Sequence, residues 1–217
     1  MKNQAIKTFL EKQRNEHERD FISIAKKEAL FEEVYQELKA FDFEAYKVAL
    51  ASEIRQNLVQ DWTNTAEGIV KEEELYAILF EYDHFFAKDV EAEAYGIGEW
   101  EDYQVQTEDF DMGWDYDFTS GFYALNGLTL NFFDPLEKLD DPNLPVRLQE
   151  ADIFGMPGFY ELIELFRYSG MVAIHEVLIK LDAEGLFEVL NYKNDFMFII
   201  DEHDSSEVFP LLIKEKA

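Results

Sequence analysis

The sequence contains no cysteine among its 217 residues, so it can form neither disulfide bonds nor thiolate metal sites. A chain without cysteine fits a reducing compartment such as the cytosol. No window has the apolar length of a membrane span, and residues 1–20 lack the apolar stretch of a signal peptide. These absences predict a cytoplasmic protein that does not enter a membrane.

Positive charge is scarce as well. The chain has 19 Lys and Arg against 47 Asp and Glu, which gives a net charge of −28. Nucleic-acid binding needs Lys and Arg to displace the counterions of the phosphates, so this balance argues against a nucleic-acid partner. Anionic membrane surfaces are disfavoured for the same reason. A basic protein surface is the electrostatic complement of such a chain.

Between Lys88 and Lys138 the sequence has no Lys or Arg at all. Within this interval, "WEDYQVQTEDFDMGWDYDF" (Trp100 to Phe118) alternates acids with aromatic rings. Exposed aromatic side chains anchor protein interfaces and acids form a charged rim, so the segment is predicted to face a basic protein partner. A charged loop folded over its own core is the alternative. The predicted interface residues are Trp100, Glu101, Asp102, Tyr103, Asp109, Asp111, Trp114, Asp115, Tyr116 and Asp117.

Apolar residues make up 47% of the chain and aromatic residues 16%, which is too rich for a disordered protein. The length predicts a single domain over residues 1–217, with a helical part over 1–62 and a sheet-plus-helix part over 63–217. Apolar residues repeat with helical spacing from Phe21 to Leu38, whereas residues 12–20 are wholly polar and could form only a solvated or frayed helix. Asp42 is the predicted N-cap of another helix, which ends at "TNTAEG".

The period changes in the middle of the chain. "ELYAILFEYD" (Glu74 to Asp83) and "DVEAEAYGIG" (Asp89 to Gly98) predict two strands joined as an antiparallel hairpin. In the second strand Val90, Ala92 and Ala94 alternate with Glu91, Glu93 and Tyr95. Residues 121–133 fit either a hairpin that turns at Asn126-Gly127 or a helix, and the hairpin is favoured.

Pro157 opens a long helical pattern that Ser169-Gly170 could bend or split and that Gly185 stops. "FMFIID" (Phe196 to Asp201) predicts a short strand, and "SSEVFPLLI" a turn or short helix. The predicted fold class is therefore α+β, with N-terminal helices, a mostly antiparallel central sheet, and a long helix followed by a short strand.

Motifs with a known chemistry are weak. Asp109, Asp111, Asp115 and Asp117 resemble a calcium loop, but Gly113 and Trp114 stand where an oxygen ligand and glycine belong. In "HEVLI", Ile179 replaces the second histidine of a zinc helix, so His175 is predicted to be a surface or boundary residue. The sequence therefore predicts no cofactor and no metal ion. The alternative is a metal-assisted hydrolase built on Asp201, His203 and Asp204.

"LDAEGLF" and "FMFIIDEHDSSE" lie between Leu181 and Glu207, downstream of the strand "LYAILFEYD". Together these segments resemble a bacterial domain family of unknown function, whose layout is similar to that of immunity proteins encoded beside toxins. The resemblance implies an α+β fold and a toxin or similar effector as the basic partner. It implies no catalytic residues, and residues 100–157 have no counterpart in the family.

From the charge and this resemblance we expect an interaction module that occludes a basic partner rather than an enzyme. Acids between Asp89 and Asp117 would steer association, and Trp100 and Trp114 would slow dissociation. An acidic scaffold whose charge serves solubility is a further alternative.

Overall fold

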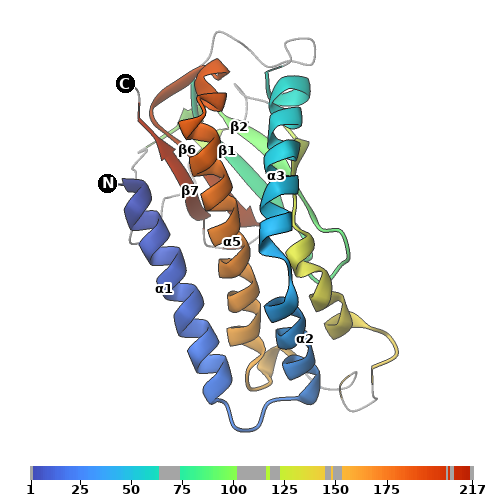
Figure 1. Ribbon diagram of the computed structural model, residues 1–217. Helices are drawn as coiled ribbons and strands as arrows, with labels where there is room; N and C mark the ends of the chain where they lie inside the picture. The colour runs from blue at the N-terminus through green and yellow to red at the C-terminus, as the bar shows by residue number, and fades with distance from the viewer. Residues whose placement is uncertain are drawn as a thin grey trace.

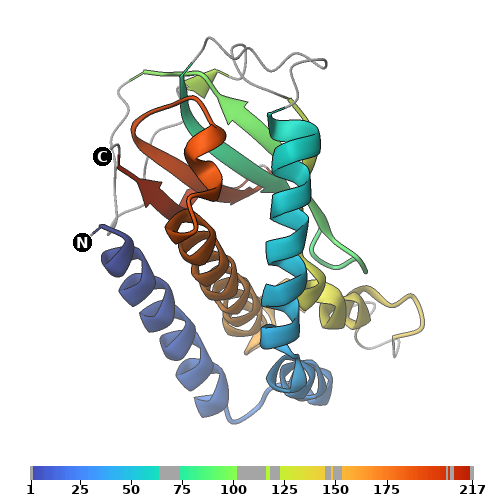
Figure 2. The same ribbon diagram turned by 45° about the horizontal axis from the view of Figure 1, so that its top comes forward.

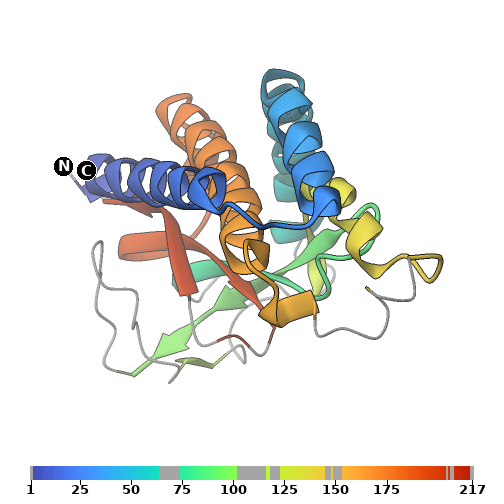
Figure 3. The same ribbon diagram turned by 90° about the horizontal axis from the view of Figure 1, so that it is seen from below.

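The computed structural model describes residues 2–63, 74–101, 116–117, 123–144, 148, 153–203, 205 and 208–215 of the chain. These residues form a five-stranded sheet with helices on one side of it, as Figures 1 and 3 show. The helical layer comprises α1 (Lys2–Ser23), α2 (Ala29–Ala40), α3 (Phe43–Asn57) and α5 (Phe159–Ala183). In Figure 2, α5 lies between α1 and α3, and it packs against both of them.

The N-terminal helices differ from the prediction in their boundaries. α1 is continuous through the polar residues 12–20, and the helical pattern from Phe21 to Leu38 is interrupted after Ser23 before α2 begins. None of residues 12–20 is buried, as expected for a stretch without an apolar stripe. Ile6, Leu10 and Phe21 bury α1 at its two ends, so tertiary packing holds the polar middle in place.

The start and end of α3 agree with the prediction. The Asp42 carboxylate accepts a hydrogen bond from the Ala45 amide at 2.9 Å, which satisfies one of the free N–H groups of the first turn. The helix continues into a short π-helical segment, η1 (Leu58–Trp62), which stops just before the predicted breaker.

The sheet has the strand order β5-β2-β1-β6-β7. β1 and β2 form the predicted antiparallel hairpin, whereas the central pair β1 and β6 runs parallel. Its strands are β1 (Leu75–Tyr82), β2 (Glu91–Ile97), β5 (Leu125–Thr129), β6 (Tyr192–Glu202) and β7 (Val208–Lys214). A small second sheet pairs β3 (Glu99–Trp100) with β4 (Tyr116–Asp117).

The favoured hairpin turn at Asn126-Gly127 is wrong, because both residues lie within the single strand β5. Gly127 is required for close approach rather than for a turn. A Cβ atom there would lie 2.2 Å from the carbonyl oxygen of Ala92, where the pairing with β2 shifts its register. The following residues form a 3₁₀ helix, η3 (Asn131–Asp140), which buries Phe132 and Leu136.

The long C-terminal helix is confirmed, and α5 is not split at Ser169-Gly170. Gly170 instead makes room for a ring from η3, since a Cβ atom would lie 2.0 Å from Phe132. Gly185, at φ +76°, ends the helix in the left-handed conformation that glycine adopts without strain. Two further 3₁₀ turns flank this helix, η4 (Ile153–Gly155) and η5 (Leu186–Val189).

"SSEVFPLLI" was predicted as a turn or short helix, and this is wrong, because Val208–Lys214 forms the edge strand β7. Its seven residues are all buried, a pattern that periodicity does not distinguish from a short buried helix. Pro210 is tolerated because the pairing of β7 with β6 shifts its register there and the strand lies at the sheet edge.

One hydrophobic cluster reaches from Ile6 on α1 to Ile213 on β7. On the helical side of the sheet, Phe80 and Phe198 stack beneath Trp62. Leu79 and Ile199, which alternate with them, are also fully buried. The α+β fold class is therefore confirmed, with a mostly antiparallel sheet.

Candidate interaction surface

β2 lies at the start of the interval between Lys88 and Lys138 that has no Lys or Arg. Glu91 and Glu93 are exposed, and Ala92 and Ala94 are buried, as the alternation predicted. Tyr95 departs from that alternation because it is buried, with its hydroxyl donating to Glu93 Oε2 at 2.5 Å. β2 is anchored on both sides by β1 and β5, so its carboxylates project from a rigid element.

The structure describes few of the predicted interface residues. Trp100 lies in β3, paired with Tyr116 of β4, and it is only 5% exposed. It belongs to the hydrophobic core, so its prediction as an exposed anchor is wrong. Glu101, directly after it, is exposed. For Tyr116 and Asp117 the backbone alone is described, and the remaining predicted residues lie outside the described ones: Asp102, Tyr103, Asp109, Asp111, Trp114 and Asp115.

The described bases are mostly bound to acids of the helical layer and the far edge of the sheet. Glu176 of α5, for example, binds both Lys7 of α1 and Lys47 of α3, at 3.1 and 3.0 Å. Other ion pairs between elements are Lys2–Asp195, Lys39–Glu18, Arg55–Glu184, Lys138–Glu33, Arg167–Glu202 and Lys214–Asp182. Positive charge is therefore used to join the elements of the fold.

The exposed carboxylates on β2 and around β3 differ from these acids because they lack ion pairs with described bases. Glu91, Glu93, Glu99 and Glu101 are exposed, and within the described ranges no Lys or Arg forms an ion pair with them. We call these four residues the acidic strand surface.

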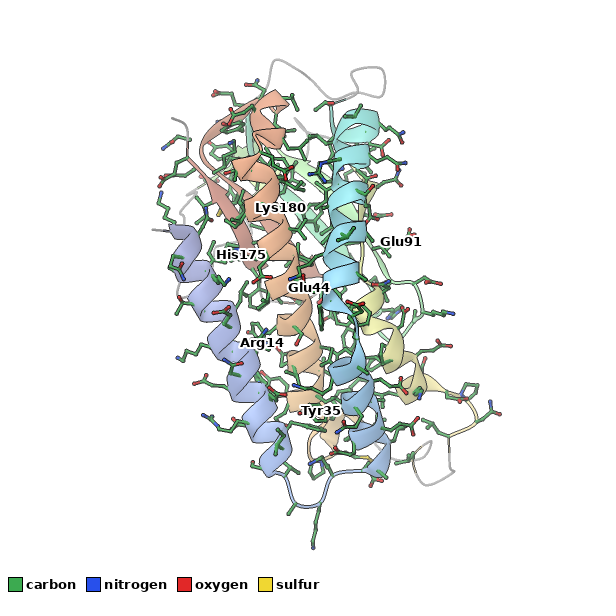
Figure 4. All side chains as sticks on the ribbon, in the orientation of Figure 1. Arg14, Tyr35, Glu44, Glu91, His175 and Lys180 are labelled. Atoms are coloured by element: carbon green, nitrogen blue, oxygen red, sulfur yellow. The ribbon has the colours of Figure 1, made fainter. Side chains whose placement is uncertain are left out.

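Beside this surface, α3 and the β2–β5 edge enclose an open groove of about 680 Å³. Ala49, Ser52 and Gln56 line it from α3, while Glu91 and Glu93 line it from β2. Figure 4 shows Glu91 beside α3. No Lys or Arg is among the described residues that line this groove.

The groove has a rigid floor because side chains of α3 and η1 bind the backbone of β5. Asn57 Nδ2 donates to the Gly127 carbonyl and Trp62 Nε1 to the Asn126 carbonyl, both at 2.8 Å. Glu53 accepts from the Thr129 amide at 3.1 Å and from its hydroxyl at 2.7 Å. These bonds satisfy outward backbone groups that a sheet edge would otherwise leave unpaired.

Of the alternative hydrolase residues, the structure describes Asp201 and His203, whose side chains have different partners. Asp201 is 3% exposed and accepts from Ser205 Oγ at 2.6 Å, and burial raises its pKa to about 7. His203 is half exposed and faces Glu81 Oε1 at 3.3 Å instead. Asp204 lies outside the described residues. Among those that are described, no cluster of three His, Asp or Glu could hold a metal ion.

Next to Asp201, a buried ionic cluster joins α5 to the end of β6. Arg167 binds Glu164 at 2.6 Å and also binds Glu202. Burial opposes the charge of Arg167, but Tyr82 and the two glutamates outweigh it and raise the pKa. The cavity among Arg167, Asp201 and Glu202 measures about 10 Å³, which is one water at most. This cluster is structural and has no room for a substrate.

The prediction that His175 is a surface or boundary residue is wrong, because its side chain is buried and only 2% exposed. Its Nδ1 lies 2.6 Å from the Leu211 carbonyl oxygen, so this nitrogen carries the proton and donates. Burial lowers its pKa, which keeps the ring neutral. Figure 4 shows His175 on the side of α5 that faces α1 and β7.

Sequence reasoning missed the groove residues on α3. A signal was present, since the exposed groove residues Ala49, Ser52 and Gln56 are uncharged in a chain that is 30% charged. What the sequence lacks is the pairing of α3 with β5, which brings this face next to Glu91 and Glu93.

In comparisons with protein-family models, curated proteins and solved structures, nothing matches this chain. None of the helices that the structure describes is long and apolar enough to cross a membrane.

Proposed function

We propose that this protein is an acidic interaction module that binds a basic protein through the acidic strand surface. One observation carries the proposal. Glu91, Glu93 and Glu99 on paired strands, and Glu101 directly after β3, are exposed and have no Lys or Arg counterion among the described residues. Where the described fold neutralises a carboxylate, as at Glu176, it supplies bases, and the lack of described bases at β2 and β3 supports a partner outside the chain.

The mechanism is electrostatic steering followed by occlusion. Exposed like charges on a rigid surface raise the association rate of an oppositely charged partner, and salt screens this effect. The resemblance found in the sequence makes a toxin or similar effector the proposed partner class. Binding would cover the basic surface that such a protein needs for its own substrate.

The test uses the partner recovered from the native host with the full-length chain as bait. Association of the Glu99→Lys/Glu101→Lys variant is measured by surface plasmon resonance across a salt series. We expect a slower association rate at low salt, because two attractive charges become repulsive, and convergence with wild type as the screening length falls below about 10 Å.

A matched control is Glu16→Lys/Asp20→Lys on α1, which changes the net charge equally. It should slow association less than the strand variant does. Equal slowing by both variants would show that the effect comes from net charge alone and not from the acidic strand surface. Recovery of no basic partner, or an unchanged rate in the folded strand variant, would contradict the proposed function.

A further inference from the structure

The groove between α3 and the β2–β5 edge has two chemically different walls. On the α3 side, Ala49, Ser52 and Gln56 are exposed, and Val48, one position before them, is 73% exposed. On the β2 side, Glu91 and Glu93 are exposed carboxylates. The α3 wall therefore has small exposed side chains and one carboxylate, Glu53, which is bound to Thr129, and the β2 wall has two exposed carboxylates.

The α3 wall suits another helix. Residues at positions i, i+3 and i+7, here Ala49, Ser52 and Gln56, follow one face of α3. Side chains as small as Ala and Ser let a second helix approach to an interaxial distance of about 8 Å, the short end of the usual range. Val48 would add an apolar contact beside them.

An added strand does not fit this groove. Pairing with β5 would need its outward carbonyl and amide groups, and α3 and η1 already bind those of Asn126, Gly127 and Thr129. The occupant must therefore bind with its side chains, as a helix lying in a groove does.

The charge of the groove lining determines which kind of helix it can bind. Glu53, Glu91 and Glu93 line the groove, and the described lining includes no Lys or Arg. A second copy of this chain is disfavoured because each copy carries a net charge of −28. The groove between α1, α5 and α3 differs, since its Lys39 and Lys47 are already paired with Glu18 and Glu176.

We propose that the groove between α3 and the β2–β5 edge receives a basic helix of the partner protein, with small apolar side chains against Ala49 and Ser52 and with Lys or Arg toward Glu91 and Glu93. The inference rests on the proposed function and adds where the partner docks and in what conformation. It extends the contact from the acidic strand surface onto α3.

The test measures binding of a short, fluorescently labelled Ala/Lys helical peptide to the full chain by anisotropy at about 0.15 M salt. Ser52→Lys places a positive charge in the groove at an exposed helical position, so folding should survive. We expect its dissociation constant to rise about tenfold, which corresponds to about 1.4 kcal/mol of added repulsion. Asn15→Lys, exposed on α1, adds the same charge and should change the constant less than about twofold.

The outcomes separate the two proposals. If Ser52→Lys and Asn15→Lys weaken peptide binding equally, or if Ser52→Lys does not weaken it, the groove is not the docking site. The proposed function is unaffected by either result. If wild type binds neither the peptide nor any basic protein, both proposals fail. Concentration-dependent dimerisation that Ser52→Lys abolishes would assign the groove to a second copy and overturn the basic helix.

Discussion

Single residues in this protein show how burial changes the chemistry of a side chain. Asp201 and His175 are both nearly inaccessible; Asp201 is hydrogen-bonded to Ser205 Oγ and to the Glu202 backbone, and His175 to the Leu211 carbonyl oxygen. Burial disfavours the charged form in both cases, so it raises the pKa of Asp201 and lowers that of His175. Their sequence contexts suggested a ligand and a surface residue, yet both serve the packing of the sheet.

Asp201→Asn is predicted to change how stability depends on pH. The pKa of Asp201 is about 7 in the folded chain and about 4 in the unfolded chain, so the folded state retains a proton that the unfolded state has lost. Its contribution is complete below about pH 4 and is lost as pH rises through about 7, at a cost of roughly 2 to 4 kcal/mol. Asparagine keeps an acceptor for Ser205 without ionising. We expect the variant to exceed wild type in stability at pH 8.

Urea unfolding of both proteins between about pH 5 and pH 9 measures this difference. Asp140→Asn, at an exposed position, is the control and should follow the wild-type curve. Stability curves for Asp201→Asn and wild type that run parallel across this range would show that Asp201 ionises normally.

At the scale of elements, the two edges of the sheet are protected by side chains from helices. At β7, Asn3 of α1 donates to the Ile213 carbonyl and accepts from its amide, each at 2.8 Å. At β5, Tyr46 donates to the Thr129 carbonyl and Glu53 accepts from the Thr129 amide. Open edges invite pairing with other chains, so these contacts direct any partner to side chains rather than to backbone.

Glu53→Ala is predicted to loosen the β5 edge. Removing the carboxylate deprives the Thr129 amide and hydroxyl of their acceptor, which should cost about 1 to 2 kcal/mol of stability. Hydrogen exchange should show faster exchange of the Thr129 amide, with little change at β6. Glu53→Gln keeps an acceptor oxygen and should restore most of the protection. Unchanged Thr129 exchange in Glu53→Ala would show that the contact is not stabilising.

The whole molecule combines a dense core with an excess of negative charge. Positive charge is concentrated in ion pairs between helices, such as Lys7 and Lys47 with Glu176, while the acidic strand surface remains unpaired within the described ranges. This separation lets the chain form an α+β fold while the acidic strand surface keeps a field of one sign.

Moderate salt is predicted to raise the melting temperature. The unpaired carboxylates repel one another in the folded state, and about 0.1 M salt reduces the screening length to about 10 Å, which weakens that repulsion. Calorimetry at increasing sodium chloride measures the shift. The variant Glu91→Gln/Glu93→Gln/Glu99→Gln/Glu101→Gln should show a smaller response. A melting temperature that falls with salt would mean that ion pairs outweigh repulsion.

Local signals in the sequence determined much of the fold. The apolar spacing of α3 and α5, the cap at Asp42, the stop at Gly185 and the alternation along β2 all rest on neighbours within one element. Such features follow from backbone geometry and from side-chain periodicity, which are encoded locally. The excess of acid over base was likewise evident from composition alone.

Only the tertiary structure decided the features that depend on distant neighbours. Gly127 lies in a strand because β5 pairs with β2, where Ala92 leaves no room for a Cβ, and Val208–Lys214 is a strand because it pairs with β6. Trp100 is buried in the core, and Ala49, Ser52 and Gln56 of α3 line one groove with Glu91 and Glu93. In each case the deciding contact joins different elements of the chain, so its energy appears only when those elements pack.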